Sequence, residues 1–297
     1  WRPAPQRFHA FVQAIMSKLG FHSLKADPCI YAHASRMLYV LSHVDDPCKV
    51  GSDEDLKWIS DQLRAVMSYN PSASCIREVP QRFLGKLYSR KDDRIIIQHD
   101  PKYVQDLVAL AGLTMSSKGA ATPGTESLRP STAEEKEWWD ESLCSQDVTL
   151  YRAIMGKLRF MAPERPDMSY ELSVLSQHLS SPTLEHLHRA KRLVRYVLAT
   201  KDSKLVLEKK DGAQSVMHID VFADSDHAGD VTTRRSVSCG VVFVNSSLVH
   251  IHSRRQTVVS TSSAEAELYA ACGAAQEGLL LRTLCQELNL PCTLSLH

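Results

Sequence analysis

The most informative stretch of this chain for the fold reads HIDVFADSD and occupies residues 218–226. Its first seven residues form an extended run. Two more such runs, at 236–244 and 248–253, are joined by the short polar turn 245–247. Short apolar runs separated by polar turns are typical of antiparallel strands. The region therefore predicts a three-stranded β-meander.

A long helix is predicted directly after this meander. Ser262 is followed three residues later by Glu265, which is the spacing of a capping box at a helix start. We expect the helix to continue to about Glu287 and a fourth strand to follow at 293–296. The side of the helix that faces the core is predicted to consist of apolar residues: Leu268, Ala271, Ala275, Leu279 and Leu280.

Two acids stand where this meander and helix could combine them. Asp224 ends the first strand, and Glu267 lies within the first two turns of the helix. Two such acids, joined by others from later strands, can hold two metal ions about 4 Å apart for phosphodiester hydrolysis. Asp226 can equally be a turn residue and Glu265 a capping acid. Neither local role explains an acid at Glu267 among small and apolar residues.

A second acidic pair, Asp45 and Asp46, follows an extended run at 37–44. Paired carboxylates at a tight turn suit Mg²⁺, which prefers oxygen ligands. An Asp–Asp pair is also a common turn feature, so the pair alone does not decide. Pro47 is expected to end this run because proline cannot donate to a strand ladder.

The remaining periodicity predicts an alternation of helices and strands. Helical spacing of apolar residues occurs in five segments: 6–19, 53–66, 103–111, 150–161 and 184–198. Extended runs occur in three further places: 30–32, 81–89 and 94–99. Ser181 and Pro182 are expected to start the last helix as N-cap and first helical residue. That helix is rich in bases, which form either a solvated face or a phosphate-facing surface.

Composition excludes several protein classes. The 297 residues carry 35 Lys and Arg against 34 Asp and Glu, so the net charge is +1, and 43% are hydrophobic. This rules out a disordered, collagen-like or globally charged tail protein. Residues 126–147 concentrate acids and predict an exposed connector. The chain starts at Trp1 rather than Met, so we expect an internal piece of a longer protein.

Membrane, secretion and metal signals are weak in the sequence. No run approaches the ~20 apolar residues of a membrane span, and the N-terminus does not have the layout of a signal peptide. The eight cysteines contain no Cys-x-x-Cys pair, which favours reduced intracellular thiols. His250 and His252 alternate, as do His186 and His188, but no Cys or third His stands at ligand spacing. A histidine metal site is therefore not predicted.

Taken in order, these segments resemble the Pol polyprotein of copia-type LTR retrotransposons along nearly the whole chain. Residues 2–8 resemble the segment before the palm helix, 40–46 the Tyr-x-Asp-Asp polymerase motif, and 82–85 the Phe-Leu-Gly motif. Three segments resemble the connection region of that family: 151–158, 165–170 and 181–200. Four further segments resemble its ribonuclease H domain: 223–230, 234–236, 253–256 and 262–267.

This resemblance implies functional residues and partners. Asp45 and Asp46 match the polymerase aspartates, and Asp224 and Glu267 match the first two ribonuclease H acids, all as ligands of Mg²⁺. The implied partners are an RNA template, a DNA primer, an RNA–DNA hybrid and the rest of the Pol polyprotein, without a membrane. The residues expected to contact nucleic acid are basic: Arg189, Lys191, Arg192, Arg195, Arg254 and Arg255. The implied location is intracellular, in cytoplasmic virus-like particles or the nucleus.

The implied fold is α+β, with a partial reverse transcriptase followed by a truncated ribonuclease H-like α/β domain. Four regions are expected: palm and thumb at 1–115, an acidic linker at 116–148, a connection with the basic helix at 149–215, and the N-terminal part of ribonuclease H at 216–297. The sequence departs from the family pattern at four positions: His43 replaces Tyr, Pro47 should disturb the returning strand, and His227 and His252 replace Trp.

The expected function is that of a Pol fragment whose parent is an RNA-directed DNA polymerase and hybrid ribonuclease. Other essential acids are expected before Trp1 and after His297, so the isolated chain is predicted to catalyse neither reaction. Two alternatives remain open. One is a non-catalytic nucleic-acid-binding remnant of a decayed or co-opted retroelement, and the other is a genomic relic that never folds.

Overall fold

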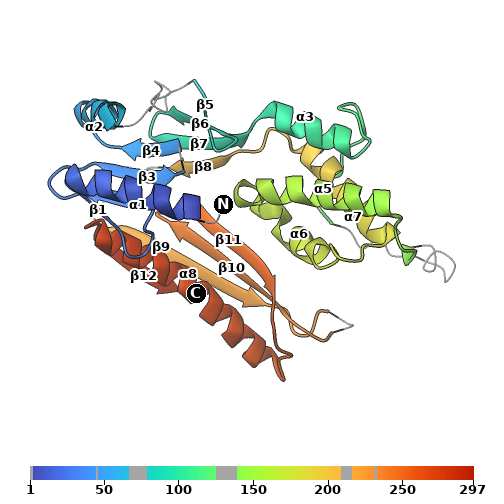
Figure 1. Cartoon of the computed structure of the whole chain (residues 1–297). Helices are drawn as coiled ribbons and strands as arrows, with labels where there is room; N and C mark the ends of the chain where they lie inside the picture. Colours follow the sequence, from blue (N-terminus) through green and yellow to red (C-terminus); the bar gives the residue numbers. More distant parts are fainter. Residues whose placement is uncertain (1–2, 45, 67–78, 125–138, 209–215, 231–232) are drawn as a thin grey trace.

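The computed structural model of the chain describes residues 3–44, 46–66, 79–124, 139–208, 216–230 and 233–297. These residues form three four-stranded sheets with helices packed against them (Figure 1). Helix and sheet are thus mixed, as the sequence predicts. Asp45 and residues 125–138 of the predicted acidic linker lie outside the described residues. No helix in the described ranges is long and apolar enough to cross a membrane.

The N-terminal sheet is antiparallel in chain order and is packed against two helices. Its elements are α1 (Pro3–Lys18), β1 (Phe21–Ser23), β2 (Ile30–His33), β3 (Tyr39–His43), β4 (Asp46–Val50) and α2 (Asp53–Val66). The run predicted at 37–44 does end there, because β3 stops at His43. The prediction that Pro47 disturbs the returning strand is wrong, since β4 runs through Pro47 and pairs it with Ser42. β4 is an edge strand, where the missing N–H of a proline is tolerated.

The middle sheet joins distant parts of the chain. It contains β5 (Gln81–Phe83), β6 (Lys86–Lys91), β7 (Arg94–His99) and β8 (Leu205–Glu208), in that order. The single strand predicted at 81–89 is instead a tight hairpin. Leu84 and Gly85 have φ of 48° and 78°, a left-handed conformation that turns the chain back on itself. A hydrophobicity pattern does not report that turn.

A helical layer follows the middle sheet. It consists of α3 (Pro101–Leu110), α5 (Ser145–Met161), η2 (Ala162–Glu164), η3 (Pro166–Met168), α6 (Ser169–Ser176) and α7 (Leu184–Ala199). One hydrophobic core unites α3, α5, α6 and α7, so packing crosses the predicted regions 1–115 and 149–215. The N-cap of α7 is Thr183, not Ser181, and the His186 side chain closes its capping box.

The C-terminal sheet is the predicted meander with one strand added. It contains β9 (Met217–Ser225), β10 (Val237–Val244), β11 (Ser247–Arg255) and β12 (Cys292–Leu296), with the helix α8 (Ser263–Glu287) on one face (Figure 1). The strand order is β11-β10-β9-β12, and β12 runs parallel to β9. A helical crossover between β11 and β12 permits this parallel pairing.

The buried face of α8 differs from the predicted one. Small residues four positions apart lie against the sheet: Ala266, Ala270, Ala274 and Gly278. A Cβ at Gly278 would lie 2.6 Å from Val221 Cγ2, so the helix approaches the strands closely. Leu268 is 63% exposed, and Leu279 and Leu280 are also exposed. The larger apolar residues were the wrong choice, because close helix–sheet packing admits only small side chains.

Candidate functional site

The predicted polymerase pair is only partly described. Asp46 is the exposed first residue of β4, directly opposite His43 of β3. The turn between these strands contains Val44, whose φ is 52°. Asp46 therefore lies at the tip of a hairpin, and its partner Asp45 is outside the described residues.

Asp224 and Glu267 lie toward the same end of the C-terminal sheet. Ser225, which follows Asp224, pairs with Ser238 of β10. The Gln256 Nε2 atom donates to Ser238 Oγ and to the Ala266 carbonyl, each at 2.9 Å. This amide links the first turn of α8 to β10, beside the end of β9 that carries Asp224.

The two acids do not share one face of the sheet. Val221 and Ala223 belong to the core beneath α8. Because side chains alternate along a strand, Asp224 is directed to the opposite face. Asp224 and Glu267 are both exposed. The structure thus places the two acids at one end of the sheet but on different faces of it.

The neighbouring acids have the local roles considered for them. Asp226 Oδ1 accepts a hydrogen bond from Val237 N at 2.7 Å, so this carboxylate holds a turn. Glu265 Oε2 accepts from Thr261 N and Oγ1, and these bonds lower the pKa of its carboxyl group. Ser262 is the N-cap of α8, as predicted, and accepts from Glu265 N.

The basic residues of α7 differ in how far the fold uses them. Arg189 Nε and Nη2 donate to the two carboxylate oxygens of Glu171 at 2.9 and 3.0 Å, and Glu185 lies 3.3 Å from Nη1. The Glu171 side chain is only 6% exposed. Arg192 Nη2 donates to Thr122 at 3.0 Å. Arg189 is therefore a structural partner of a buried acid, whereas Lys191 and Arg195 are half-buried on the same helix.

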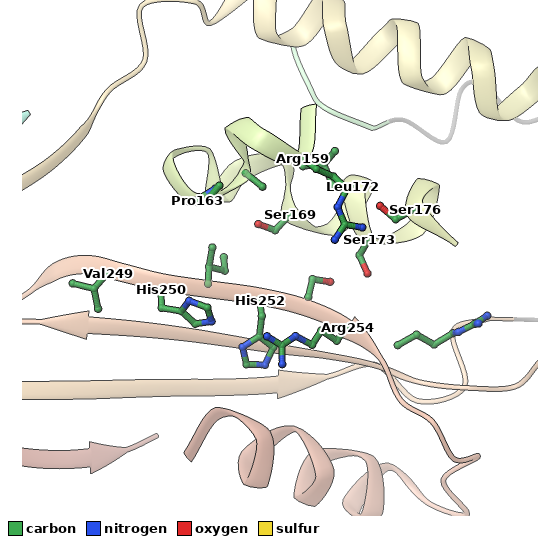
Figure 2. Close-up of a pocket in the computed structure, with 14 residues that line it drawn as sticks. Arg159, Pro163, Ser169, Leu172, Ser173, Ser176, Val249, His250, His252 and Arg254 are labelled. Atoms are coloured by element: carbon green, nitrogen blue, oxygen red, sulfur yellow. The ribbon is translucent and has the colours of Figure 1, made fainter. Parts of the chain in front are cut away.

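Arg254 and Arg255 line a cavity of about 580 Å³ between α6 and β11. Figure 2 shows His250, His252 and Arg254 following one another along β11, with serines of α6 across the gap. Arg159 adds a third guanidinium to the lining. The Arg254 side chain is 66% exposed, while Arg255 pairs with Asp230 at 3.2 Å. The cavity therefore combines basic groups with hydroxyl groups: Ser169, Ser173 and Ser176. Sequence reasoning missed Arg159, Ser169, Ser173 and Ser176.

The same strand carries a cluster that the sequence did not predict. His250, His252 and Glu277 each offer a ligand atom, and these atoms all lie within 4.8 Å of one another. The two histidines were noted, but the expected third ligand was a nearby Cys or His. Glu277 comes from α8, so only packing brings it there. The pKa of His252 is lowered by burial first and then by Arg254 and His250.

Comparison with known proteins identifies similar proteins. No family model matches the chain. It is 26% identical, over 97% of its length, to the retrovirus-related Pol polyprotein from transposon RE2 of Arabidopsis thaliana. The chain is thus similar, over nearly its whole length, to copia-type Pol polyproteins of transposons. This confirms the resemblance seen in the sequence.

The chain spans only 19% of the length of that Pol polyprotein. It covers 92% of another relative, the uncharacterized mitochondrial protein AtMg00810 of Arabidopsis thaliana, with 29% identity over 81% of this chain. Among solved structures, a foamy viral protease-reverse transcriptase in complex with an RNA/DNA hybrid matches 97% of the chain and 31% of its own, at 11% identity and a TM-score of 0.47.

Proposed function

We propose that this copia-type chain is the part of a Pol polyprotein that joins reverse transcriptase to ribonuclease H and binds an RNA–DNA hybrid. Within this proposal, residues 1–115 belong to palm and thumb, 149–215 to the connection, and 216–297 to ribonuclease H, with 116–148 as linker. The RNA template, the DNA primer and the remaining Pol segments are its partners. Its place of action is the cytoplasmic virus-like particle or the nucleus.

The observation that carries the ribonuclease H assignment is the topology of the C-terminal sheet. Three antiparallel strands in chain order are followed by α8 and then by β12, parallel to β9. Asp224 and Glu267, which match the family's first two acids, lie toward one end of this sheet. A shared sheet end supports their assignment to one site better than sequence spacing alone. Asp45 and Asp46 are the corresponding proposal for the polymerase.

The described residues do not fit a complete Mg²⁺ centre. In the described ranges, no three carboxylates lie within ligand distance of one another. Two-metal hydrolysis needs several acids around both ions, and Asp224 and Glu267 are directed to different faces. We therefore propose that the chain on its own neither polymerises nor cleaves. Binding of the hybrid is the activity that it can express alone.

Hybrid binding is supported by the cavity between α6 and β11. Arg159 and Arg254 are exposed and provide cations for phosphate oxygens, and the facing serines provide hydroxyl donors. Arg255 is half-buried and pairs with Asp230, so it contributes less than these two. Lys191, Arg192 and Arg195 of α7 contribute less, because each is half-buried. Arg189 contributes least, because Glu171 and Glu185 already engage its guanidinium.

The test is titration of a labelled RNA–DNA hybrid at several salt concentrations. The logarithm of the association constant should fall linearly with the logarithm of salt, since each phosphate contact releases counterions. The triple variant Arg159→Gln, Arg254→Gln, Arg255→Gln should bind more weakly, and its salt slope should be smaller by about one for each lost phosphate contact. An unchanged slope would contradict the proposal.

A charge-matched control variant separates this surface from overall charge. Lys57, Arg64 and Lys91 are exposed on α2 and β6, away from the cavity. Their replacement by Gln should leave the affinity for the hybrid close to that of the parent chain. Equal losses in both triple variants would indicate attraction by net charge alone and would reject the cavity as the binding surface.

The second candidate is the non-catalytic remnant. It is favoured by the coverage of AtMg00810, a relative that this chain matches over nearly its full length. Such a chain would bind hybrid and duplex DNA alike, because sequence-independent binding rests on phosphates. A preference for the hybrid over duplex DNA of equal length would argue against the remnant.

A further inference from the structure

The cluster His250–His252–Glu277, here called the histidine–glutamate triad, has the composition of a transition-metal site. His250 and His252 project from β11, and Glu277 from α8, which packs on the same sheet. One ligand atom of each residue lies within 4.8 Å of those of the other two. Two imidazoles and one carboxylate bind Zn²⁺ in enzymes that keep a fourth position open.

Two nitrogen atoms of the triad are buried without a hydrogen-bond partner. They are His250 Nε2 and His252 Nδ1. His252 as a whole is only 7% exposed. Buried polar atoms in native proteins are nearly always paired, and leaving one unpaired costs about 1–3 kcal/mol. An ion bound between the two rings would give both atoms a partner.

The backbone beneath His252 leaves room for its ring. Gly240 is directly opposite His252 in the β10–β11 ladder. A Cβ at position 240 would lie 2.3 Å from His252 Cε1 and 2.8 Å from Nε2. Glycine is therefore required for the ring to lie flat over β10, where it stays within reach of Glu277. The ring position depends on this glycine as well as on His252 itself.

We propose that the histidine–glutamate triad binds a divalent transition-metal ion of the zinc type. The imidazole ligands distinguish it from the oxygen-only sites that Mg²⁺ prefers. His252 stands where the pattern of the family that the sequence resembles has tryptophan. The proposal does not depend on hybrid binding.

The observed spacing is close to what such an ion requires. Zn–N distances of about 2.0–2.1 Å imply neighbouring ligand atoms roughly 3.3 Å apart in a tetrahedral site. His250 Nε2 and Glu277 Oε1 are 3.8 Å apart. Small side-chain movements therefore suffice. His250 and His252 also belong to the lining of the cavity between α6 and β11.

Arg254 is the group that competes with the metal. Its Nη2 atom lies 3.5 Å from Glu277 Oε1, and its side chain is 66% exposed. The guanidinium can therefore swing into solvent when a cation arrives. Removal of this charge should strengthen metal binding, whereas removal of a ligand should weaken it. These opposite directions distinguish a built site from loose binding by surface histidines or thiols.

The experiment is titration of the full chain with Zn²⁺ against a chromophoric chelator, under reducing conditions and after metal removal. One ion per chain should bind, and Glu277→Gln should weaken it at least about 100-fold, since even loss of a residue that only orients a ligand costs about 10–100-fold. His252→Gln should have a similar effect, while Arg254→Gln should tighten binding. His218→Gln, at an exposed histidine of β9, is the matched control and should change nothing.

Two readouts keep the result independent of folding defects. Far-ultraviolet circular dichroism should show that Glu277→Gln, a change on a partly exposed helix position, retains its helix content. Saturating Zn²⁺ should raise the Tm of the parent chain and not that of Glu277→Gln, because a ligand stabilises only the state that binds it. Equal Zn²⁺ affinity in the parent, Glu277→Gln and His218→Gln chains would overturn the proposal.

Discussion

Helix α7 and strand β11 both carry rows of basic residues, yet they use them differently. On α7, Arg189 is locked between Glu171 and Glu185, and Arg192 bonds to Thr122. On β11, Arg255 pairs with Asp230, and Arg254 lies 3.5 Å from Glu277 but is largely exposed beside a cavity. A basic run in a sequence therefore does not by itself indicate a phosphate-binding surface.

The difference follows from where the two elements lie. α7 packs into the largest hydrophobic core of the described residues. At the edge of this core, Arg189 lies between Glu171 of α6 and Glu185 in the preceding turn of α7. β11 is an edge strand of its sheet, and its residues 249–255 line the cavity that faces α6. The acid Glu171 beside Arg189 on the central helix is buried, whereas the acids beside Arg254 and Arg255 on the edge strand are partly exposed.

The largest effect on stability is expected for the ion pair between Arg189 of α7 and the buried Glu171 of α6. Arg189→Met would leave the carboxylate of Glu171 without its partner at 6% side-chain exposure. Breaking a buried pair in this way costs about 3–5 kcal/mol in the free energy of unfolding. Urea denaturation measures it. Lys191→Met, on the same helix, should change the free energy of unfolding little. Equal destabilisation by both variants would contradict the claim that Arg189 is the structural base of α7.

The next largest effect concerns the close packing of α8 on the sheet that contains β11. Gly278→Ala would bring a Cβ to 2.6 Å from Val221 Cγ2, and overpacking of this kind costs about 1–3 kcal/mol. Gly273 has no atom within 4 Å of an added Cβ. Gly273→Ala should therefore stabilise α8 by up to about 1 kcal/mol through helix propensity. Thermal unfolding of both variants would reveal the opposite signs.

A smaller effect, on the pH dependence of stability, is expected for His186, whose side chain completes the capping box of α7. Its pKa is held at about 4 by burial first, then by His178 and Arg189. An unfolded histidine titrates near 6.5, so the unfolded chain binds more protons between these values. Stability should therefore fall as pH drops, by about 1 kcal/mol for this residue between about pH 7 and 5.5.

Urea midpoints measured across this pH range check the assignment of His186. His186→Gln should show a shallower decline than the parent chain, by the share of one histidine. An equally steep decline would mean that other groups carry the pH dependence. His99, whose pKa is likewise lowered to about 4 by burial and then by Lys86 and Arg165, should account for part of the decline that remains.

Local sequence signals predicted the elements well where they act over a few residues. The helix predicted at 53–66 is α2, and Ser262 caps α8 as its spacing indicates. The prediction of 81–89 as one strand failed because a left-handed turn at Leu84 and Gly85 divides it. The core face of α8 was missed because the closeness of helix and sheet, rather than hydrophobicity, decides which residues fit.

The candidate sites show the same limit at longer range. Glu277 stands 25 positions after His252, and only the packing of α8 on the sheet brings them together. The partnership of Arg189 with Glu171 likewise depends on α6 lying beside α7. A sequence names the residue types that a site needs, but the tertiary contacts decide which of them are free to act.

The central claim is that the edge strand β11, and not α7, supplies the main nucleic-acid contacts. The most direct measurement compares the salt dependence of hybrid binding in two triple variants with Gln in place of the bases: Arg159, Arg254 and Arg255 in one, and Lys191, Arg192 and Arg195 in the other. The account predicts the larger loss of affinity and of salt slope in the first variant. An equal or larger loss in the α7 variant would contradict it.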